Sequence, residues 1–513
     1  MKNIRKLRKL NNWVMIKITK TLFYVLLLAI VATACSKEND AVTVDNSQNG
    51  TASGCEVVFQ LLTPAVGAEV TRGVDDSYQA EQGTEKEWIV KSVKIYLFDS
   101  QTGLRAKAVD ISQLERSQGT VNGYVTYLTK PVVISQGTYD IFAVANYSGK
   151  IDAATEQEFL ATVDASTYKQ ALLPNADNPI VMSNRASANT GVEIKDKKDE
   201  NLVSVTLERA LARIDLGRKY SSYDINDASG VKYADVSLDG FRFVNLPKSY
   251  YVFRHTATLT SMDTPQWDIH THFGDIPEAN GYVIDPYFFN KSIDASRFNN
   301  PDAYYENFSG SLGNGDALSW TQFPEVTTTP AYKTYYSLEN CMIWQAQKKG
   351  YSTGLVFKAS FNPNNNVYKA DDSGKLVIAS QAEYPDSLFF YDYKFYTSKE
   401  ALAKAGVDIS QVDDKDEMAY QNVKLFRRKN DKYVCYYDYW IKHLENNDPY
   451  VMGVMEFAVV RNNLYRLLIT SISELGNSTP EVNPDTPDEG ETSIKALINV
   501  KPWVVRDQTN IIL

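Results

Sequence analysis

Hydrophobic and polar residues alternate in short runs along most of this chain, which is the pattern of half-buried β-strands. The clearest early run places Val57, Phe59 and Leu61 on one face of a strand, opposite a mixed face. A polar stretch follows and contains the bond between Arg72 and Gly73. These features suit an ordinary first strand before a surface loop. They also suit a strand that a protease removes, which would leave an apolar groove for a strand of another chain.

Short strands with frequent turns continue over residues 73–208, and they predict an antiparallel β-sandwich as the N-terminal domain. Residues 137–146 are apolar on both faces, as expected for a central strand. A short helix is expected over residues 153–162. The predicted strands cover residues 88–99, 124–129, 132–134, 137–146, 180–183 and 202–216.

Residues 209–476 predict a second β-sandwich, the C-terminal domain. A hairpin of two strands around a tight turn is expected over residues 455–472. Residues 287–330 and 361–420 are weakly patterned and predict loops. The other predicted strands cover residues 236–247, 281–286, 335–340, 354–359 and 433–443. The chain is therefore predicted to be all-β, with two sandwiches in tandem.

The C-terminal end of the chain has the pattern of a strand on a linker. Residues 477–491 are rich in proline and acidic residues, so regular structure is not expected there. Within residues 492–513, apolar positions alternate with mostly polar ones. These apolar residues are Ile494, Ala496, Ile498 and Val500. Such a strand can be donated to a neighbouring chain, or it can fold back onto its own domain.

Residues 1–34 have the pattern of a secretory signal. They contain seven Lys and Arg and no Asp or Glu, and their apolar run is too short to span a bilayer comfortably. Small residues precede Cys35, which is similar to the lipobox of bacterial lipoproteins, whose cysteine becomes the lipid-modified first residue. An uncleaved membrane anchor is the alternative, and translation can start at Met1 or Met15. Residues 35–72 would form a tether and the removable strand.

Composition narrows the range of partners. The formal net charge of −10 argues against nucleic acid. The 33 Tyr residues favour strands and raise glycan binding as an alternative function. One aromatic cluster could stack on sugars, although aromatics that alternate on a strand more often form core contacts. The cluster consists of Tyr436, Tyr437, Tyr439 and Trp440.

Motifs for catalysis are not evident, so an enzyme is not expected. The chain has no Gly-rich phosphate loop, no nucleophile elbow and no His-Glu-x-x-His motif. Arg461, Asn462 and Asn463 are interpreted as a turn rather than as catalytic residues. The prediction is that the protein uses no cofactor.

Two polar clusters have partial metal-ligand spacing. Asp45 and Glu56 stand at the first and last ligand positions of a calcium loop, but a strand rather than a helix follows them. His270 and His272 can converge on one strand face, but no third separated His or Cys is near them in the sequence. No metal site is predicted from either cluster.

The four cysteines fit an exported protein. Cys35 would carry the lipid, and Cys55 would leave with the removed strand. Cys341 and Cys435 remain, and we expect both to be buried and unpaired.

Four segments of the N-terminal domain occur in a characteristic order: Ile95–Asp99, Gly137–Asn146, Ile180–Ser183 and Leu207–Ile214. This order resembles that of the fimbrillins, which are lipoprotein precursors of the type V pili of some Gram-negative bacteria. In the C-terminal domain, residues 433–443 and 455–465 are similar to the major subunits of minor, or short, fimbriae. The resemblance covers about residues 22–513.

The resemblance implies two transthyretin-like antiparallel β-sandwich domains in tandem. It also implies that an arginine-specific surface protease cuts between Arg72 and Gly73 and removes the N-terminal strand. The C-terminal strand of another subunit would then fill the vacated groove. No cofactor is implied.

A protein of this kind would be a structural subunit of a bacterial fimbrium that supports cell adhesion. Its implied partners are other copies of itself, other fimbrial subunits, the protease, the lipoprotein processing machinery, and receptors on host or bacterial surfaces. Its implied location is a fimbrium on the cell surface, reached from a precursor that lipid attaches to the outer membrane. The alternatives are a fimbrial tip or anchor subunit and a surface glycan-binding lipoprotein.

Overall fold

The computed structural model describes most of the chain from Gly54 onward. The described residues are 54–64, 83–118, 124–175, 177–196, 201–257, 282–286, 300–329, 331–341, 347–410, 412, 423–443, 455–488 and 494–502. Cys35, the Arg72–Gly73 bond and the pair of His270 and His272 lie outside these ranges. Among the residues that are described, no helix is long and apolar enough to cross a membrane.

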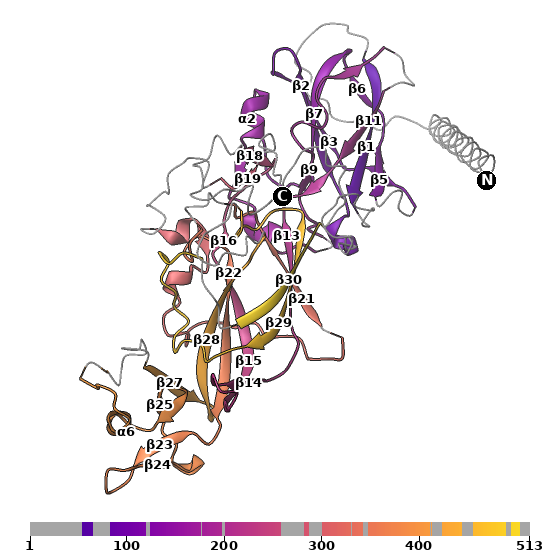
Figure 1. The fold of residues 1–513 in the computed structure, drawn as a ribbon. Coiled ribbons are helices and arrows are strands. Elements are labelled where there is room, and N and C mark those ends of the chain that lie inside the picture. Colours follow the sequence, from indigo (N-terminus) through magenta and orange to yellow (C-terminus); the bar gives the residue numbers. More distant parts are fainter. Residues whose placement is uncertain are drawn as a thin grey trace, which may run out of the picture. The chain divides into compact units, whose positions relative to one another are not determined.

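Two sheets face each other in the N-terminal part of the chain (Figure 1). The first has the strand order β11-β1-β5-β4, with β6 also paired to β1. Its strands are β1 (Cys55–Pro64), β4 (Leu114–Arg116), β5 (Tyr124–Thr129), β6 (Val132–Ile134) and β11 (Leu202–Thr206). The second has the order β12-β9-β7-β2-β3, with β10 also paired to β7. Its strands are β2 (Val93–Asp99), β3 (Arg105–Ile111), β7 (Gly137–Ala145), β9 (Met182–Ser183), β10 (Val192–Ile194) and β12 (Glu208–Arg209).

The alternating side chains of these strands form one core between the two sheets. Ile95 and Leu97 of β2 point inward and meet Phe59 and Leu61 of β1, all without solvent exposure. The strand β7 is apolar on both faces because helix α2 (Glu156–Leu160) covers its other side, where Phe159 packs on Phe142. This is the central strand that the sequence predicted. Other short elements are η1 (Glu85–Glu87), β8 (Val163–Asp164) and α3 (Tyr168–Ala171).

The C-terminal part also consists of two sheets. The smaller has the order β21-β13-β29-β30, from strands β13 (Ala212–Arg218), β21 (Tyr332–Ser337), β29 (Asn463–Ile472) and β30 (Ile494–Pro502). The larger has the order β14-β15-β22-β28-β27-β25-β26-β23-β24. Its strands are β14 (Tyr223–Asn226), β15 (Lys232–Val244), β22 (Gly354–Pro363), β23 (Val367–Ala370), β24 (Leu376–Ile378), β25 (Ser387–Tyr391), β26 (Lys394–Tyr396), β27 (Lys424–Lys429) and β28 (Lys432–Trp440).

Short pairings complete the fold. β16 (Leu246–Pro247) pairs with β20 (Tyr305–Glu306), and β18 (His255–Ala257) pairs with β19 (Tyr282–Ile284). β17 (Tyr250–Tyr251) pairs with β8 and thereby connects the chain beyond β15 to a segment of the N-terminal part. The remaining elements are η3 (Pro301–Ala303), η4 (Ser309–Ser311), η6 (Gln381–Glu383) and α6 (Lys399–Lys404).

The all-β prediction is confirmed, and three details of it are wrong. The strand expected over residues 202–216 is divided into β11, β12 and β13, because the chain changes sheets twice along it. The hairpin over residues 455–472 has only its second strand, since Val459 makes an isolated bridge with Asn340 instead. The stretch 361–420 is not a loop: its described residues include β23 to β26, which extend the larger sheet, and the helix α6.

Candidate strand-exchange interface

The strand β1 lies in the middle of its sheet and has neighbours on both sides. It runs parallel to β11, with Val58 opposite Leu202 and Leu62 opposite Thr206. On its other side it runs antiparallel to β5 and to β6 in turn. Figure 1 shows β1 between β11 and β5. A segment near the start of the chain therefore fills a central position, and the strands beside it come from much later in the sequence.

Every second side chain of β1 enters the core. Val57, Phe59 and Leu61 have no solvent exposure, and Cys55 and Thr63 at the ends of the row are also buried. Full burial of a large apolar side chain stabilises a fold by roughly 1.5–3 kcal/mol, so the first three contribute about 5–9 kcal/mol together. This face is the one that the sequence pattern predicted to be apolar.

Removing β1 would divide its sheet, because β1 alone joins β11 to β5 in the described strand order. The edges of β11, β5 and β6 would lose their backbone partners, and apolar residues of the core would meet water. Exposed strand edges of this kind readily pair with a strand from another chain. The geometry of the groove therefore suits replacement of β1 by another strand with the same alternation.

Truncating Phe59 should destabilise the uncleaved protein strongly. We expect Phe59→Ala to lower the free energy of unfolding by about 3–5 kcal/mol, because it empties a fully buried site. The matched control Gln60→Ala alters the partly exposed face of the same strand, where it removes only an exposed hydrogen bond from the Ser204 hydroxyl, and it should cost less than about 1 kcal/mol. Urea unfolding of both variants measures the difference, and equal losses would contradict the packing described for β1.

The strand β30 lies at the edge of its sheet and pairs only with β29 among the described strands. Their antiparallel register joins Asn463 with Pro502 at one end and Ile472 with Ile494 at the other. Within one chain the C-terminal strand is thus folded back onto its own domain, which is the arrangement that the sequence left as the alternative to donation. An edge strand can leave without dividing its sheet, since β21, β13 and β29 remain paired.

The linker before β30 is anchored to the C-terminal domain over residues 477–488. It has no helix or strand, as predicted, but Asn477 and Tyr436 exchange two backbone hydrogen bonds of 2.7 and 2.8 Å. Further along, the Lys349 N–H donates to the Thr486 carbonyl at 2.9 Å. The buried Asp488 accepts a hydrogen bond from the Ser352 hydroxyl. The last described anchor of the linker is therefore Asp488, just before β30.

The anchor at Asp488 should weaken as the pH rises. Burial raises the pKa of Asp488 to about 8, although the Ser352 hydroxyl and the nearby Lys349 favour the charged form. The carboxyl of an unfolded Asp titrates near 3.9. Between these values the folded protein binds the proton and the unfolded chain does not, so the stabilisation is full below about pH 4 and is lost through about pH 8.

We therefore expect the stability advantage of the wild type over Asp488→Asn to fall by about 4 kcal/mol between pH 5 and pH 8.5, because each pH unit between the two pKa values changes the free energy of unfolding by about 1.4 kcal/mol. The amide of the variant is neutral at every pH and serves as the reference. Unfolding free energies measured at several pH values give the difference. A constant difference across this range would show that Asp488 is ionised in the folded protein.

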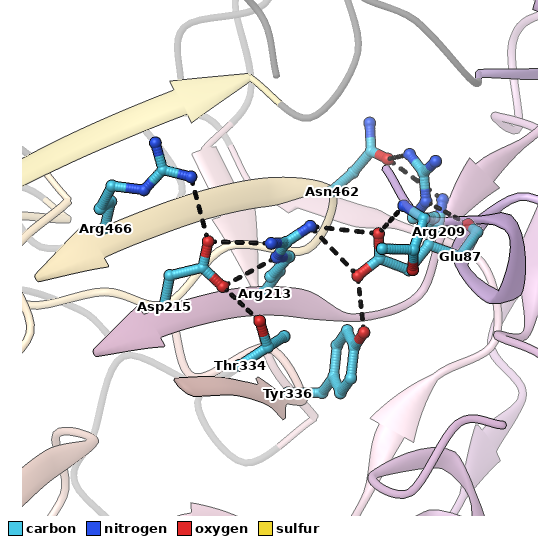
Figure 2. A network of polar contacts seen from close by, with 9 residues as sticks. Glu87, Arg209, Arg213, Asp215, Thr334, Tyr336, Asn462 and Arg466 are labelled. Carbon is cyan, nitrogen blue, oxygen red and sulfur yellow. Dashed lines mark hydrogen bonds and ion pairs between the residues drawn. The ribbon is translucent and has the colours of Figure 1, made fainter. Parts of the chain in front are cut away.

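A buried polar network connects η1 of the N-terminal part with the smaller sheet of the C-terminal part (Figure 2). Glu87 of η1 has no solvent exposure and accepts from Arg213 of β13 at 3.2 Å and from the Tyr336 hydroxyl at 2.6 Å. Its backbone carbonyl accepts from Arg209 at 2.5 Å. Burial is the main reason why the pKa of Tyr336 is raised, so its hydroxyl stays a donor.

The same network continues through Asp215 of β13. Arg213 donates to both carboxylate oxygens of Asp215, each at 2.9 Å, and Arg466 of β29 donates to it at 3.2 Å. Thr334 of β21 donates to the same carboxylate at 2.7 Å (Figure 2). Breaking one partner of such a buried pair typically costs about 3–5 kcal/mol. The network therefore fixes η1 against three strands of the smaller C-terminal sheet.

The turn at Arg461 and Asn462 is a second connection between the sandwiches. It is a turn, as predicted, but it is buried rather than exposed. Arg461 forms an ion pair of 2.6 Å with Glu339 and donates to the Tyr251 carbonyl at 2.6 Å. The Asn462 N–H donates to the Leu211 carbonyl at 2.7 Å. These contacts are structural, and the burial of Arg461 and Asn462 could not be predicted from the local sequence.

The aromatic cluster lies in the core rather than on a sugar-binding surface; its members are Tyr436, Tyr437, Tyr439 and Trp440, each at most 9% exposed. Cys341 and Cys435 are buried and unpaired, as expected. No group of His, Cys, Asp and Glu within the described part of the chain has the arrangement of a metal site.

These observations define the class of protein: an all-β chain of two joined sandwiches whose terminal strands occupy a central and an edge position. Residues 65–217 match the model of a family described as major fimbrial subunit protein (FimA). Residues 431–509 match the model described as major fimbrial subunit protein type IV, fimbrillin, C-terminal. The similarity to the fimbrillins that the sequence predicted is thus confirmed over these two segments. No curated protein matches it.

Several solved structures are distantly similar to this chain. A candidate cell adhesion protein from Parabacteroides distasonis is 14% identical, with 88% of this chain and 99% of that chain covered and a TM-score of 0.44. A fimbrilin (FimA) from Porphyromonas gingivalis is 14% identical, with 89% and 99% covered and a TM-score of 0.39. The tip fimbrial protein Mfa3 from the same organism is 12% identical, with 87% and 100% covered and a TM-score of 0.36. The similarity to fimbrial subunits rests on the two family matches and not on these distant structures.

Proposed function

We propose that this fimbrial subunit is a shaft-forming structural subunit that polymerises by donor-strand exchange after an arginine-specific protease removes β1. The observation that carries the proposal is the central position of β1, with its inward side chains fully buried between β11 and β5. A strand in this position cannot be lost without replacement, because its sheet would be divided. Polymerisation then follows from the need to refill the groove.

The position of Arg72 supports removal of the strand by proteolysis. Arg72 is the only Lys or Arg between the end of β1 at Pro64 and the start of η1 at Glu85. A protease that recognises arginine therefore has one site in this segment, and a cut there separates β1 from the rest of the chain. The new chain would begin at Gly73 and would remain held through Glu87 in the buried network.

The proposed donor is the C-terminal strand of another subunit. β30 has 9 residues and β1 has 10, so their lengths match. The alternation of Ile494, Ala496, Ile498 and Val500 in sequence resembles that of Val57, Phe59 and Leu61. Release of β30 from its own domain breaks its pairing with only one strand, β29. Asp488 is the last anchored residue before β30, so the released segment would begin after it.

The proposed route to the surface uses the N-terminal signal and lipid on Cys35. In this scheme the lipoprotein machinery attaches the precursor to the outer membrane, and the cut after Arg72 releases it from the lipid. Other copies of the chain and other fimbrial subunits are its partners in the fibre, and adhesion to surface receptors is the role of the fibre.

The first experiment is to determine the N-terminal residue and the intact mass of the protein sheared from the cell surface. We expect a chain that begins at Gly73 and extends to Leu513. A chain that begins at a lipidated Cys35 would overturn the proposal and would favour a fimbrial anchor or a glycan-binding lipoprotein. A Gly73 start without linkage between subunits would favour a tip subunit.

A further inference from the structure

We propose that Thr129 sets the register of the strand that fills the groove, by accepting a hydrogen bond from one backbone N–H of that strand. The inference rests on the proposed strand exchange and adds a specificity-determining residue to it. The hydrogen bond involves only the backbone of the strand in the groove. An incoming donor strand can therefore make it in the same way as β1. This backbone contact acts in addition to the side-chain pockets, since it does not depend on which apolar residue of the donor enters each pocket.

The neighbour of β1 changes from β5 to β6 at an irregular point. Gln60 pairs with Leu128 of β5, whereas Val57 pairs with Val132 of β6. Two residues of β1 thus face three residues of its neighbour, as in a β-bulge. The three residues end in Pro131, which has no N–H. The regular backbone ladder is therefore interrupted opposite the centre of β1.

Thr129 repairs this interruption with its side chain. Its hydroxyl oxygen lies 3.0 Å from the backbone nitrogen of Phe59 and accepts the hydrogen bond from its N–H. Thr129 is only 5% exposed, so water does not readily replace that donor. A hydroxyl group is a single acceptor at a fixed point in the groove, whereas a regular ladder offers equivalent acceptors at every second residue. It therefore distinguishes one register from the next.

Asn201 holds the other side of the same segment. Its backbone carbonyl accepts from the Val58 N–H at 3.0 Å, and its side-chain amide donates to the Glu56 carbonyl at 3.4 Å. The side chain is held in place by two further hydrogen bonds to the backbone of Lys195, at 2.7 and 2.9 Å. Two consecutive N–H groups of the occupant are thus bound from opposite sides. None of these contacts involves a side chain of β1, so a different strand can make them.

The test uses the exported precursor, cut with an arginine-specific protease and kept dilute so that subunits rarely meet. A fluorescent peptide with the sequence of residues 492–513 is added in excess, and its affinity for the cut protein is measured by anisotropy. A set of peptides carries one N-methyl group each along residues 494–501, so that each lacks one backbone N–H. Binding is measured to the wild type, to Thr129→Val and to the control Thr126→Val, whose side chain lies on the opposite face of β5.

We expect Thr129→Val to bind the unmodified peptide about fivefold more weakly, which is the usual effect of one neutral hydrogen bond. We also expect coupling at a single peptide position: N-methylation there weakens binding to the wild type about fivefold more than it weakens binding to Thr129→Val. Thr126→Val should behave as the wild type at every position. Thr129→Ser keeps the hydroxyl and should keep the coupling, and Thr129→Ala replaces the valine variant if that variant does not fold.

Two negative results have different meanings. If the peptide binds the cut wild type but no position is coupled to Thr129, the assignment of register to Thr129 is wrong and strand exchange stands. If no peptide binds the cut wild type at any concentration tested, strand exchange itself is wrong, and the inference fails with it.

Discussion

Replacing Arg72 with Ala is expected to abolish polymer formation while the precursor is still exported. Without the cut, β1 stays covalently attached and remains in its groove, where its buried side chains contribute about 5–9 kcal/mol. A free donor strand competes poorly with an attached one, because the attached strand has a high effective concentration. Fibres sheared from cells and viewed by electron microscopy, together with the mass of the surface protein, measure the effect.

Two further variants make the result specific to arginine. Arg72→Lys keeps the positive charge and should also block assembly if the protease requires arginine. Glu69→Ala changes a charged residue in the same segment and should leave fibres normal. Fibres of normal length from Arg72→Ala cells would rule out strand removal at this bond.

Deleting residues 494–513 should give a folded subunit that accepts a donor strand but cannot donate one. Loss of β30 leaves β21, β13 and β29 paired, and the linker remains anchored up to Asp488. Mixed with wild-type subunits, the truncated chain should end each fibre that incorporates it. An equimolar mixture should therefore contain fibres shortened to roughly two subunits on average, which is a larger effect than any single side chain would have.

The control for this deletion is Lys495→Ala, which alters the polar face of the same strand and should support fibres of normal length. Fibre lengths from electron microscopy and circular dichroism of the truncated subunit are the two measurements. Normal polymers from the truncated chain alone would mean that β30 serves only its own domain.

Strands that bury one face were predicted well from the sequence. The predicted bounds 124–129 and 132–134 are those of β5 and β6, because short runs of β-branched and aromatic residues between turn-forming residues are typical of strands. The division of residues 202–216 could not be predicted in this way. Both faces of the chain around Ala210 and Leu211 are buried, so the apolar pattern continues while the chain leaves one sandwich for the other.

The polar network between the sandwiches was also beyond prediction from the sequence. Glu87 and Arg213 are 126 residues apart, and nothing local distinguishes them from surface charges. Only the fold brings them to 3.2 Å of each other and away from water. The first and last strands were easier to recognise, because each has a one-sided apolar pattern and stands beside a segment of different composition.

In a fibre built as proposed, a pulling force would enter each subunit at the groove of its N-terminal sandwich and leave through the C-terminal strand. The force must pass from β12 to β13, where the covalent chain between them is only Ala210 and Leu211. The buried contacts of Glu87 with Arg213 and of Arg209 with Asn462 cross between the two sandwiches beside this connection and share the load. Under flow, the connection between β12 and β13 would thus resist extension because buried polar contacts reinforce the single covalent link there.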